Sequence, residues 1–239
     1  MPQTALLLHG FAGTGRMWEP VAARLDGAHY RAHAPDLRGH GTNLAQPVDA
    51  DGVVADLAAL LEAGPALVCG YSMGGRLALH LALAHPARVA RLVLVAATAG
   101  LEEGREARRA ADEALAARLE AEPIEAFAAR WTTGPLFADD PPLARARQHA
   151  DVLRNDPGRL AAALRGLGQG ALPPVWHLLD RLDMPVDVVA GARDDRYVAL
   201  AERLVDAIPG ARLHVVPGAG HGLPREAPGA LAAIIASGS

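Results

Sequence analysis

One short turn, Gly70-Tyr71-Ser72-Met73-Gly74, constrains the fold of this chain more than any other segment. The apolar residues 66–69 before it predict a buried strand, and residues 76–84 after it predict a buried helix. A Gly-x-Ser-x-Gly turn between a strand and a helix is so sharp that its two glycine positions leave almost no room for a side chain. The serine hydroxyl then projects above the sheet, beside free N–H groups of the helix that favour negative charge. The sequence therefore predicts a reactive serine, Ser72, in an α/β fold.

Short apolar strands alternate with helices along most of the chain. This alternation predicts a mostly parallel sheet that is flanked by helices on both faces. Residues 98–182 break the rhythm, because they are rich in alanine, arginine and leucine at helical spacing and contain two proline pairs. We therefore predict a core of residues 1–97 and 183–239, with residues 98–182 inserted as a helical cap above the sheet edge where such folds bind ligands. The predicted strands are 5–8, 30–34, 66–69, 91–95, 186–190 and 212–216, and the predicted helices outside the cap are 18–25, 53–62, 76–84 and 224–236.

Charge and cysteine content exclude several classes of protein. The 239 residues carry a formal net charge of −4, the 23 basic residues are all arginine, and no basic block is present, so no nucleic-acid partner is expected. The one cysteine, Cys69, lies in an apolar strand and is expected in the core. No apolar run reaches the ~18 residues of a membrane span. The N-terminus lacks a charged segment followed by a long apolar stretch, so we expect a cytoplasmic protein whose oligomeric state is left open.

Neither a metal nor a cofactor site is expected. His29, His33, Asp36 and His40 are loosely spaced and do not form a ligand cluster. The Gly-rich residues 13–16 are not a phosphate loop, because no Gly-Lys-Ser/Thr follows them.

A serine nucleophile needs a base, and the base needs an acidic group that orients it. In folds with this serine turn, the order along the chain is serine, acid, histidine. His221 is the best candidate base, because it follows the last predicted strand in a glycine-rich loop that can bring the imidazole over the serine. His214 lies inside that strand, and His80 and His85 lie on the helix after the serine, so these three are expected to be structural.

The acid is expected after the preceding strand, where Asp194 and Asp195 stand side by side. Spacing alone favours Asp194, although an ordinary solvated turn would also explain the pair. An oxyanion site in such folds uses two backbone N–H groups, one after the nucleophile and one from the first strand–helix loop. These are expected to be the N–H groups of Met73 and Phe11.

Four segments together resemble the α/β-hydrolase superfamily across the whole chain. They are the serine turn, His9-Gly10-Phe11, Gly191-Ala192-Arg193-Asp194 and Gly218-Ala219-Gly220-His221. A narrower similarity, to the 2-succinyl-6-hydroxy-2,4-cyclohexadiene-1-carboxylate synthases, lies in the serine turn and the predicted cap. These enzymes are pyruvate-eliminating lyases of menaquinone biosynthesis. The cap segments that carry it are Phe127-x3-Trp131-x3-Pro135-Leu136-Phe137, Leu-Arg-Asn-Asp-Pro at 153–157 and Leu-Arg-Gly-Leu-Gly-Gln-Gly at 164–170.

The resemblance implies an α/β-hydrolase fold with an inserted cap and a reduced N-terminal sheet edge. It implies that Ser72, Asp194 and His221 form a catalytic triad, without a cofactor. The implied substrate is a small polycarboxylate, which arginine forks would bind bidentately. The assignment of Arg108 to the substrate site is left open, because its neighbours Arg105 and Arg109 could take the same place. The implied substrate-binding residues are Tyr71, Arg76, Arg108, Trp131 and Arg154.

Three classes of function are compatible with these residues. A lyase would use the triad as a base, to remove a proton and expel pyruvate. A serine carboxylesterase, lactonase or C–C-bond hydrolase would use Ser72 as a nucleophile and form an acyl-enzyme. A ligand receptor without activity would not need the serine, base, acid and oxyanion loop together, so it is the weakest of the three.

Overall fold

The computed structural model describes residues 2–27, 29–61 and 64–237. The strands of these residues form one sheet in the order β2-β1-β3-β4-β5-β6, and every neighbouring pair is parallel. This confirms the predicted parallel sheet. β2 forms one edge of the sheet and β6 the other. The strands are β1 (Gln3–Leu8), β2 (Tyr30–His33), β3 (Ala66–Tyr71), β4 (Val89–Val95), β5 (Val186–Gly191) and β6 (Arg212–Val216).

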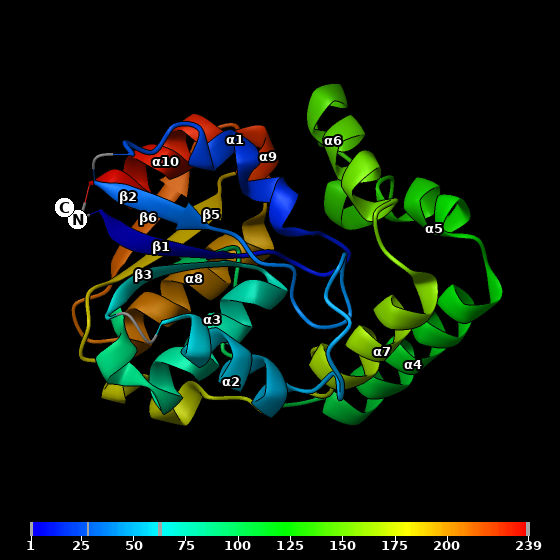
Figure 1. The fold of residues 1–239 in the computed structure, drawn as a ribbon, viewed down its shortest axis with the longest axis horizontal. Coiled ribbons are helices and arrows are strands. Elements are labelled where there is room, and N and C mark those ends of the chain that lie inside the picture. Colours follow the sequence, from blue (N-terminus) through cyan, green and yellow to red (C-terminus); the bar gives the residue numbers. More distant parts are fainter. Residues whose placement is uncertain (1, 28, 62–63, 238–239) are drawn as a thin grey trace.

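Helices cover both faces of the sheet (Figure 1). One face packs on α2 (Ala50–Leu60), α3 (Met73–Ala84) and α8 (Asp195–Ala207), and the other on α1 (Glu19–Ala22), α9 (Leu223–Glu226) and α10 (Pro228–Ala236). Alternate residues of β1, β3 and β4 point into the two resulting cores, so these strands are mostly apolar. In the described part of the chain, no helix has the length and apolar character that a membrane span requires.

The residues between β4 and β5 build a group of helices that stands apart from the sheet, at the right of Figure 1. It consists of α4 (Arg105–Ala121), α5 (Ile124–Trp131), α6 (Pro142–Val152) and α7 (Pro157–Leu167). The group has a hydrophobic cluster of its own around Phe127, Leu119 and Leu160. All four helices fall within the residues predicted as the cap. The last part of that segment, including Leu172 and Leu179, packs instead into the core on the α3 side of the sheet.

Two of the predicted helices differ in the structure. The helix predicted over 18–25 is a short 3-10 turn, Gly15–Trp18, followed by the single turn α1, which has Pro20 in its first turn. The helix predicted over 224–236 is broken into α9 and α10, because Pro228 lacks the N–H group that a continuous helix needs.

Candidate active site

Ser72 occupies the strained turn between β3 and α3. Its backbone has φ +52° and ψ −108°, a conformation that residues other than glycine rarely adopt. A Cβ on Gly70 would lie 2.3 Å from the Gly74 carbonyl oxygen, and a Cβ on Gly74 would lie 2.4 Å from the Leu8 carbonyl oxygen. Larger residues at either position would therefore force the turn open. The spacing of the two glycines is what lets the half-buried Ser72 face the cavity at the carboxyl edge of the sheet.

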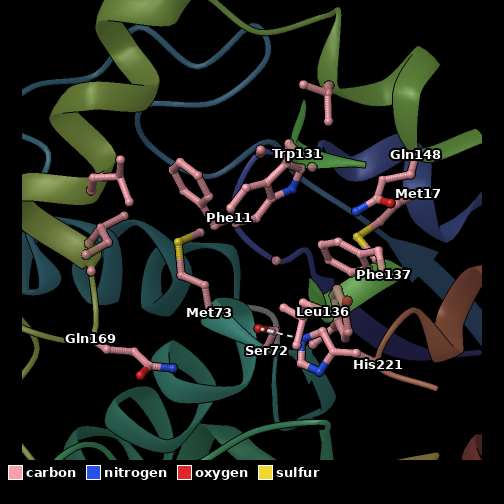
Figure 2. Close-up of a pocket in the computed structure, with 18 of the residues that line it drawn as sticks. Phe11, Met17, Ser72, Met73, Trp131, Leu136, Phe137, Gln148, Gln169 and His221 are labelled. Atoms are coloured by element: carbon pink, nitrogen blue, oxygen red, sulfur yellow. Dashed lines mark hydrogen bonds between the residues drawn. The ribbon is translucent and has the colours of Figure 1, made fainter. Parts of the chain in front are cut away.

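A continuous line of contacts runs from Ser72 through His221 to Asp194. His221 Nε2 lies 3.4 Å from Ser72 Oγ, and His221 Nδ1 lies 2.9 Å from Asp194 Oδ2 (Figure 2 shows the first contact). Asp194 follows β5 and caps α8, since its other oxygen accepts the Tyr197 N–H at 3.2 Å. Burial lowers the pKa of His221, and the neighbouring Asp194 opposes that shift. The imidazole is therefore neutral at pH 7 and able to accept a proton from the serine hydroxyl.

The alternatives to these two partners lie elsewhere. Asp195 is exposed as the first residue of α8. His214 Nε2 lies 2.7 Å from Asp187 Oδ1, in a buried cluster that Arg91 and Arg212 complete. Among the candidates, the structure thus brings His221 and Asp194, but neither His214 nor Asp195, to Ser72.

The loop after β1 lies against the serine turn. A Cβ on Gly10 would lie 2.8 Å from the Tyr71 ring, so this loop can approach only because residue 10 is a glycine. His9 is fully buried and fixes the loop: its Nε2 accepts the Leu37 N–H at 2.9 Å, so the proton is on Nδ1, which donates to the Gly10 carbonyl at 2.9 Å. Phe11 and Met73, the residues expected to supply oxyanion N–H groups, both line the cavity that contains Ser72.

That cavity has a volume of about 170 Å³ and lies between the sheet edge and the α4–α7 group. Aromatic rings form one wall, above Ser72 and His221 in Figure 2. The Trp131 ring lies 5.4 Å from the Phe11 ring and 5.9 Å from the Phe137 ring, in edge-to-face packing. The wall offers an apolar aromatic surface on the side away from Ser72 and His221.

Arg76 and Arg108, both predicted for substrate binding, also line the cavity. Arg76, one turn after Ser72 on α3, is 7% exposed, and its Nη1 has no hydrogen-bond partner among the described residues. Burial lowers the pKa of Arg76 to about 10, so it remains a cation at neutral pH. Arg108 enters from α4, where Asp112 Oδ1 at 2.8 Å and Gln169 Oε1 at 3.1 Å hold its guanidinium. A buried cation with an unused donor is suited to bind an anionic ligand.

The structure separates the three candidate arginines on α4. Arg108 lines the Ser72 cavity, whereas Arg105 donates to the backbone carbonyls of residues 170–172, and Arg109 lines a different hollow of the cap.

Of the five residues predicted for substrate binding, Arg154 is the one that does not line the Ser72 cavity. It is exposed after α6 and lines an adjoining cavity, which shares Met17, Asp151 and Arg225 with the first. Tyr71, Arg76, Arg108 and Trp131, the other four residues predicted for substrate binding, all line the Ser72 cavity.

Several residues of the site were not anticipated. Asp151 Oδ2 accepts the Thr14 N–H at 2.9 Å, and burial raises the pKa of this carboxyl. Asn155, in the Leu-Arg-Asn-Asp-Pro segment, donates to the Ala12 carbonyl at 3.1 Å and so ties α6 to the loop after β1. The Tyr197 ring lies 4.4 Å from the His221 ring. Its position three residues after Asp194 is the only signal that sequence offered for it. Gln148, Gln169 and Arg225 also line the cavity.

Among the described residues, no group of histidine, cysteine, aspartate and glutamate side chains is arranged to hold a metal ion. Cys69 is fully buried in β3, and burial raises the pKa of its thiol, so it is a core residue.

Comparison with known proteins gives the family of this fold and site. A family model described as the alpha/beta hydrolase family matches residues 5–234. The chain belongs to the α/β-hydrolase family. It is 33% identical to the 2-succinyl-6-hydroxy-2,4-cyclohexadiene-1-carboxylate synthase of Enterobacter sp. (strain 638), over 97% of this chain and 89% of that protein.

Two further matches agree with that similarity. A Bacillus subtilis (strain 168) protein, provisionally named as the same synthase, is 34% identical over 95% of this chain and 86% of its own length. The solved structure of MenH from S. aureus superposes with a TM-score of 0.92 at 27% identity, covering 98% of this chain and 91% of that one. The resemblance inferred from the cap segments is thereby confirmed.

Proposed function

We propose that this protein is a lyase that eliminates pyruvate from 2-succinyl-5-enolpyruvyl-6-hydroxy-3-cyclohexene-1-carboxylate. The observation that carries the proposal is the contact line Ser72–His221–Asp194 beneath a cavity whose wall holds the buried cation Arg76. The similarity to synthases of this name over nearly the whole chain supports the same reaction. The substrate is a small polycarboxylate, and the proposed location of the protein is the cytoplasm.

In the proposed reaction, Ser72 acts as a base. His221, oriented by Asp194, accepts the serine proton, and the serine oxygen removes a proton from the ring carbon next to the succinyl ketone. The electron pair moves onto the ketone oxygen, and the resulting enolate lies against the backbone N–H groups of Phe11 and Met73. Collapse of the enolate shifts the ring double bond and breaks the C–O bond to the enolpyruvyl group. The departing group takes up a proton and becomes pyruvate, so no external oxidant or water is consumed.

The cavity walls match the two halves of this substrate. Three carboxylates surround the ring, and Arg76 and Arg108 supply guanidinium groups that can bind carboxylates bidentately. The aromatic wall around Trp131 offers an apolar surface for the ring face. Arg154 stays a proposed substrate residue, but from the adjoining cavity it would reach only a group that extends out of the main one.

The direct test is incubation with the proposed substrate. The wild-type protein is expected to release pyruvate and the conjugated diene in equal amounts, and Ser72→Ala is expected to lose activity by several orders of magnitude while folding normally. His214→Ala is a suitable control, because it replaces a histidine that contacts Asp187 and not Ser72. Pyruvate release no faster than the spontaneous reaction would refute the proposal.

A serine hydrolase is the second candidate, because the same three side chains can also activate Ser72 for attack on an ester, lactone or C–C bond. The two reactions differ in the fate of Ser72. A hydrolase accumulates an acyl-enzyme with activated esters and shows a burst of product, whereas the lyase reaction has no covalent step.

A further inference from the structure

Two loops must keep a fixed separation if Asp194 is to orient His221. The loop after β5 carries Asp194 directly after Arg193, and the loop after β6 carries His221 five residues before Glu226, the last residue of α9. Arg193 Nη2 forms an ion pair with Glu226 Oε2 between these loops. The Glu226 side chain is only 2% exposed, so the carboxylate is shielded from water on nearly every side. The Arg193 side chain is 36% exposed, so the pair is enclosed on the Glu226 side and open to solvent on the other.

Each partner of this pair also holds backbone next to the triad. The second oxygen of Glu226, Oε1, accepts the N–H of Gly220, the residue directly before His221, at 3.0 Å. Arg193 Nε donates to the Gly218 carbonyl, in the same loop, at 3.0 Å. The loop that carries His221 is therefore hydrogen-bonded at two points. One bond comes from Arg193, which lies in the Asp194 loop, and the other comes from Glu226, which forms the ion pair with Arg193.

The remaining arm of the guanidinium reaches the cap. Arg193 Nη1 donates to the Asp139 carbonyl at 2.8 Å, just after the 3-10 turn Pro135–Phe137. Phe137 from that turn lines the Ser72 cavity, and its ring lies 5.8 Å from the His221 ring. Cap helix α6 contacts α9 in the same corner of the molecule. The Arg193 side chain thus bonds the His221 loop, α9 and the cap at once. The planar guanidinium of arginine has donors that point in these three directions, whereas lysine has a single ammonium group.

We propose that Arg193 and Glu226 are positioning residues: their ion pair holds the Asp194 loop and the His221 loop at the separation the triad needs, and ties that separation to the place of the cap. The proposal rests on the triad proposed above, but not on the identity of the substrate. The separation matters because proton transfer from Ser72 to His221 requires the two side chains to stay within hydrogen-bond distance. The His221–Ser72 contact of 3.4 Å is already at the long end of hydrogen-bond range, so a further displacement would interrupt it.

The test measures the nucleophilicity of Ser72 without a substrate, as the second-order rate of its labelling by a small fluorophosphonate. In Glu226→Gln, an isosteric change, and in Arg193→Met, labelling is expected to slow by about 10- to 100-fold, the cost of a misplacement near 1 Å. Arg193→Lys is expected to recover only part of this loss. For pyruvate release, kcat should fall in step with labelling while KM stays nearly unchanged. The double variant should lose no more than the worse single variant, because the two residues act as one unit.

The control is Arg165→Met, which breaks a comparable arginine–glutamate cluster with Glu113 and Glu120 on the outer surface of the cap. It is expected to label at the wild-type rate. Thermal unfolding of every variant, followed by circular dichroism, shows what fraction is folded in the assay. Wild-type labelling rates in folded Glu226→Gln and Arg193→Met, additive losses in the double variant, or losses that only follow the unfolded fraction would each overturn the proposal. If labelling responds as expected but the wild type releases no pyruvate, the proposed function fails and the positioning role stands.

Discussion

Single residues were predictable where local geometry leaves one solution. Only glycines fit at positions 70 and 74, so the turn marks Ser72 without any knowledge of the fold. Both Asp194 and Asp195 follow β5, and spacing alone favoured Asp194. Asp194 caps α8 and reaches His221, whereas Asp195, one position along the helix, is exposed. Arg154 could not be placed, since its distance from Ser72 depends on how the cap helices pack.

The two aspartates make a matched pair for mutation. Asp194→Asn is expected to lower kcat by about 10³- to 10⁴-fold, because an amide beside His221 Nδ1 no longer stabilises the imidazolium or selects the productive tautomer. Asp195→Asn, a neighbour of the same size in contact with solvent, is expected to leave kcat unchanged. Steady-state kinetics of pyruvate release measure both. The opposite order would assign the acid to Asp195.

The arginines should differ according to where they lie. Arg76→Met is expected to lower kcat/KM for the polycarboxylate by about 10- to 150-fold, the equivalent of losing a charge-assisted hydrogen bond of roughly 1.5–3 kcal/mol. Arg154→Met should cost less, because this side chain is exposed in the adjoining cavity. Hydrolysis of a neutral ester such as p-nitrophenyl acetate serves as the control reaction. Equal losses on both substrates would mean that Arg76 is structural.

At the scale of elements, the apolar strands were predictable and several helix limits were not. The central strands β3, β4 and β5 are mostly apolar runs that the pattern marks, because residues of a central parallel strand are buried on both faces. Helix α8 was not predicted. The hydrophobic pattern predicted one continuous helix near Pro20 and another near Pro228, whereas the structure has a break in each. The contact between the cap and the His221 loop lies between elements far apart in sequence, so no local pattern could indicate it.

Asp140, where the cap meets the His221 loop, gives a stability prediction. Burial, and then the nearby Glu226, raise the pKa of Asp140 from 3.8 to about 6. Since the folded state binds this proton more tightly than the unfolded state, the contribution of Asp140 to stability is present below pH 4 and is lost as the pH rises through about 6. Asp140→Asn removes the buried charge and is expected to stabilise the protein at pH 8 by about 1–3 kcal/mol, with little change at pH 4.

Urea unfolding at the two pH values measures this difference. Asp139→Asn is the control, because Asp139 is the exposed neighbour, and its substitution should alter stability at neither pH. A loss of stability in Asp140→Asn at pH 8, or the same change at both pH values, would show that the carboxylate of Asp140 is not strained by burial.

The whole molecule is a parallel α/β sheet with a group of helices over its carboxyl edge, and its site is made where the two meet. The sheet and its reactive residues could be predicted, because each follows from a short segment at the end of a strand. The cavity could not, because its walls come from helices α3 to α8 and from the loops after β1 and β6. Its buried arginine and its aromatic wall are properties of that assembly, and the proposed polycarboxylate substrate rests on them.

The most direct test is a single-turnover experiment, with enzyme in excess over a substrate that is deuterated at the ring carbon next to the succinyl ketone. If the Ser72–His221–Asp194 line removes that proton, diene and pyruvate should form together and more slowly than from the protonated substrate, while the mass of the intact protein stays unchanged. A mass increase on Ser72 during turnover, with the same rate for both substrates, would contradict the account and identify Ser72 as an acyl acceptor.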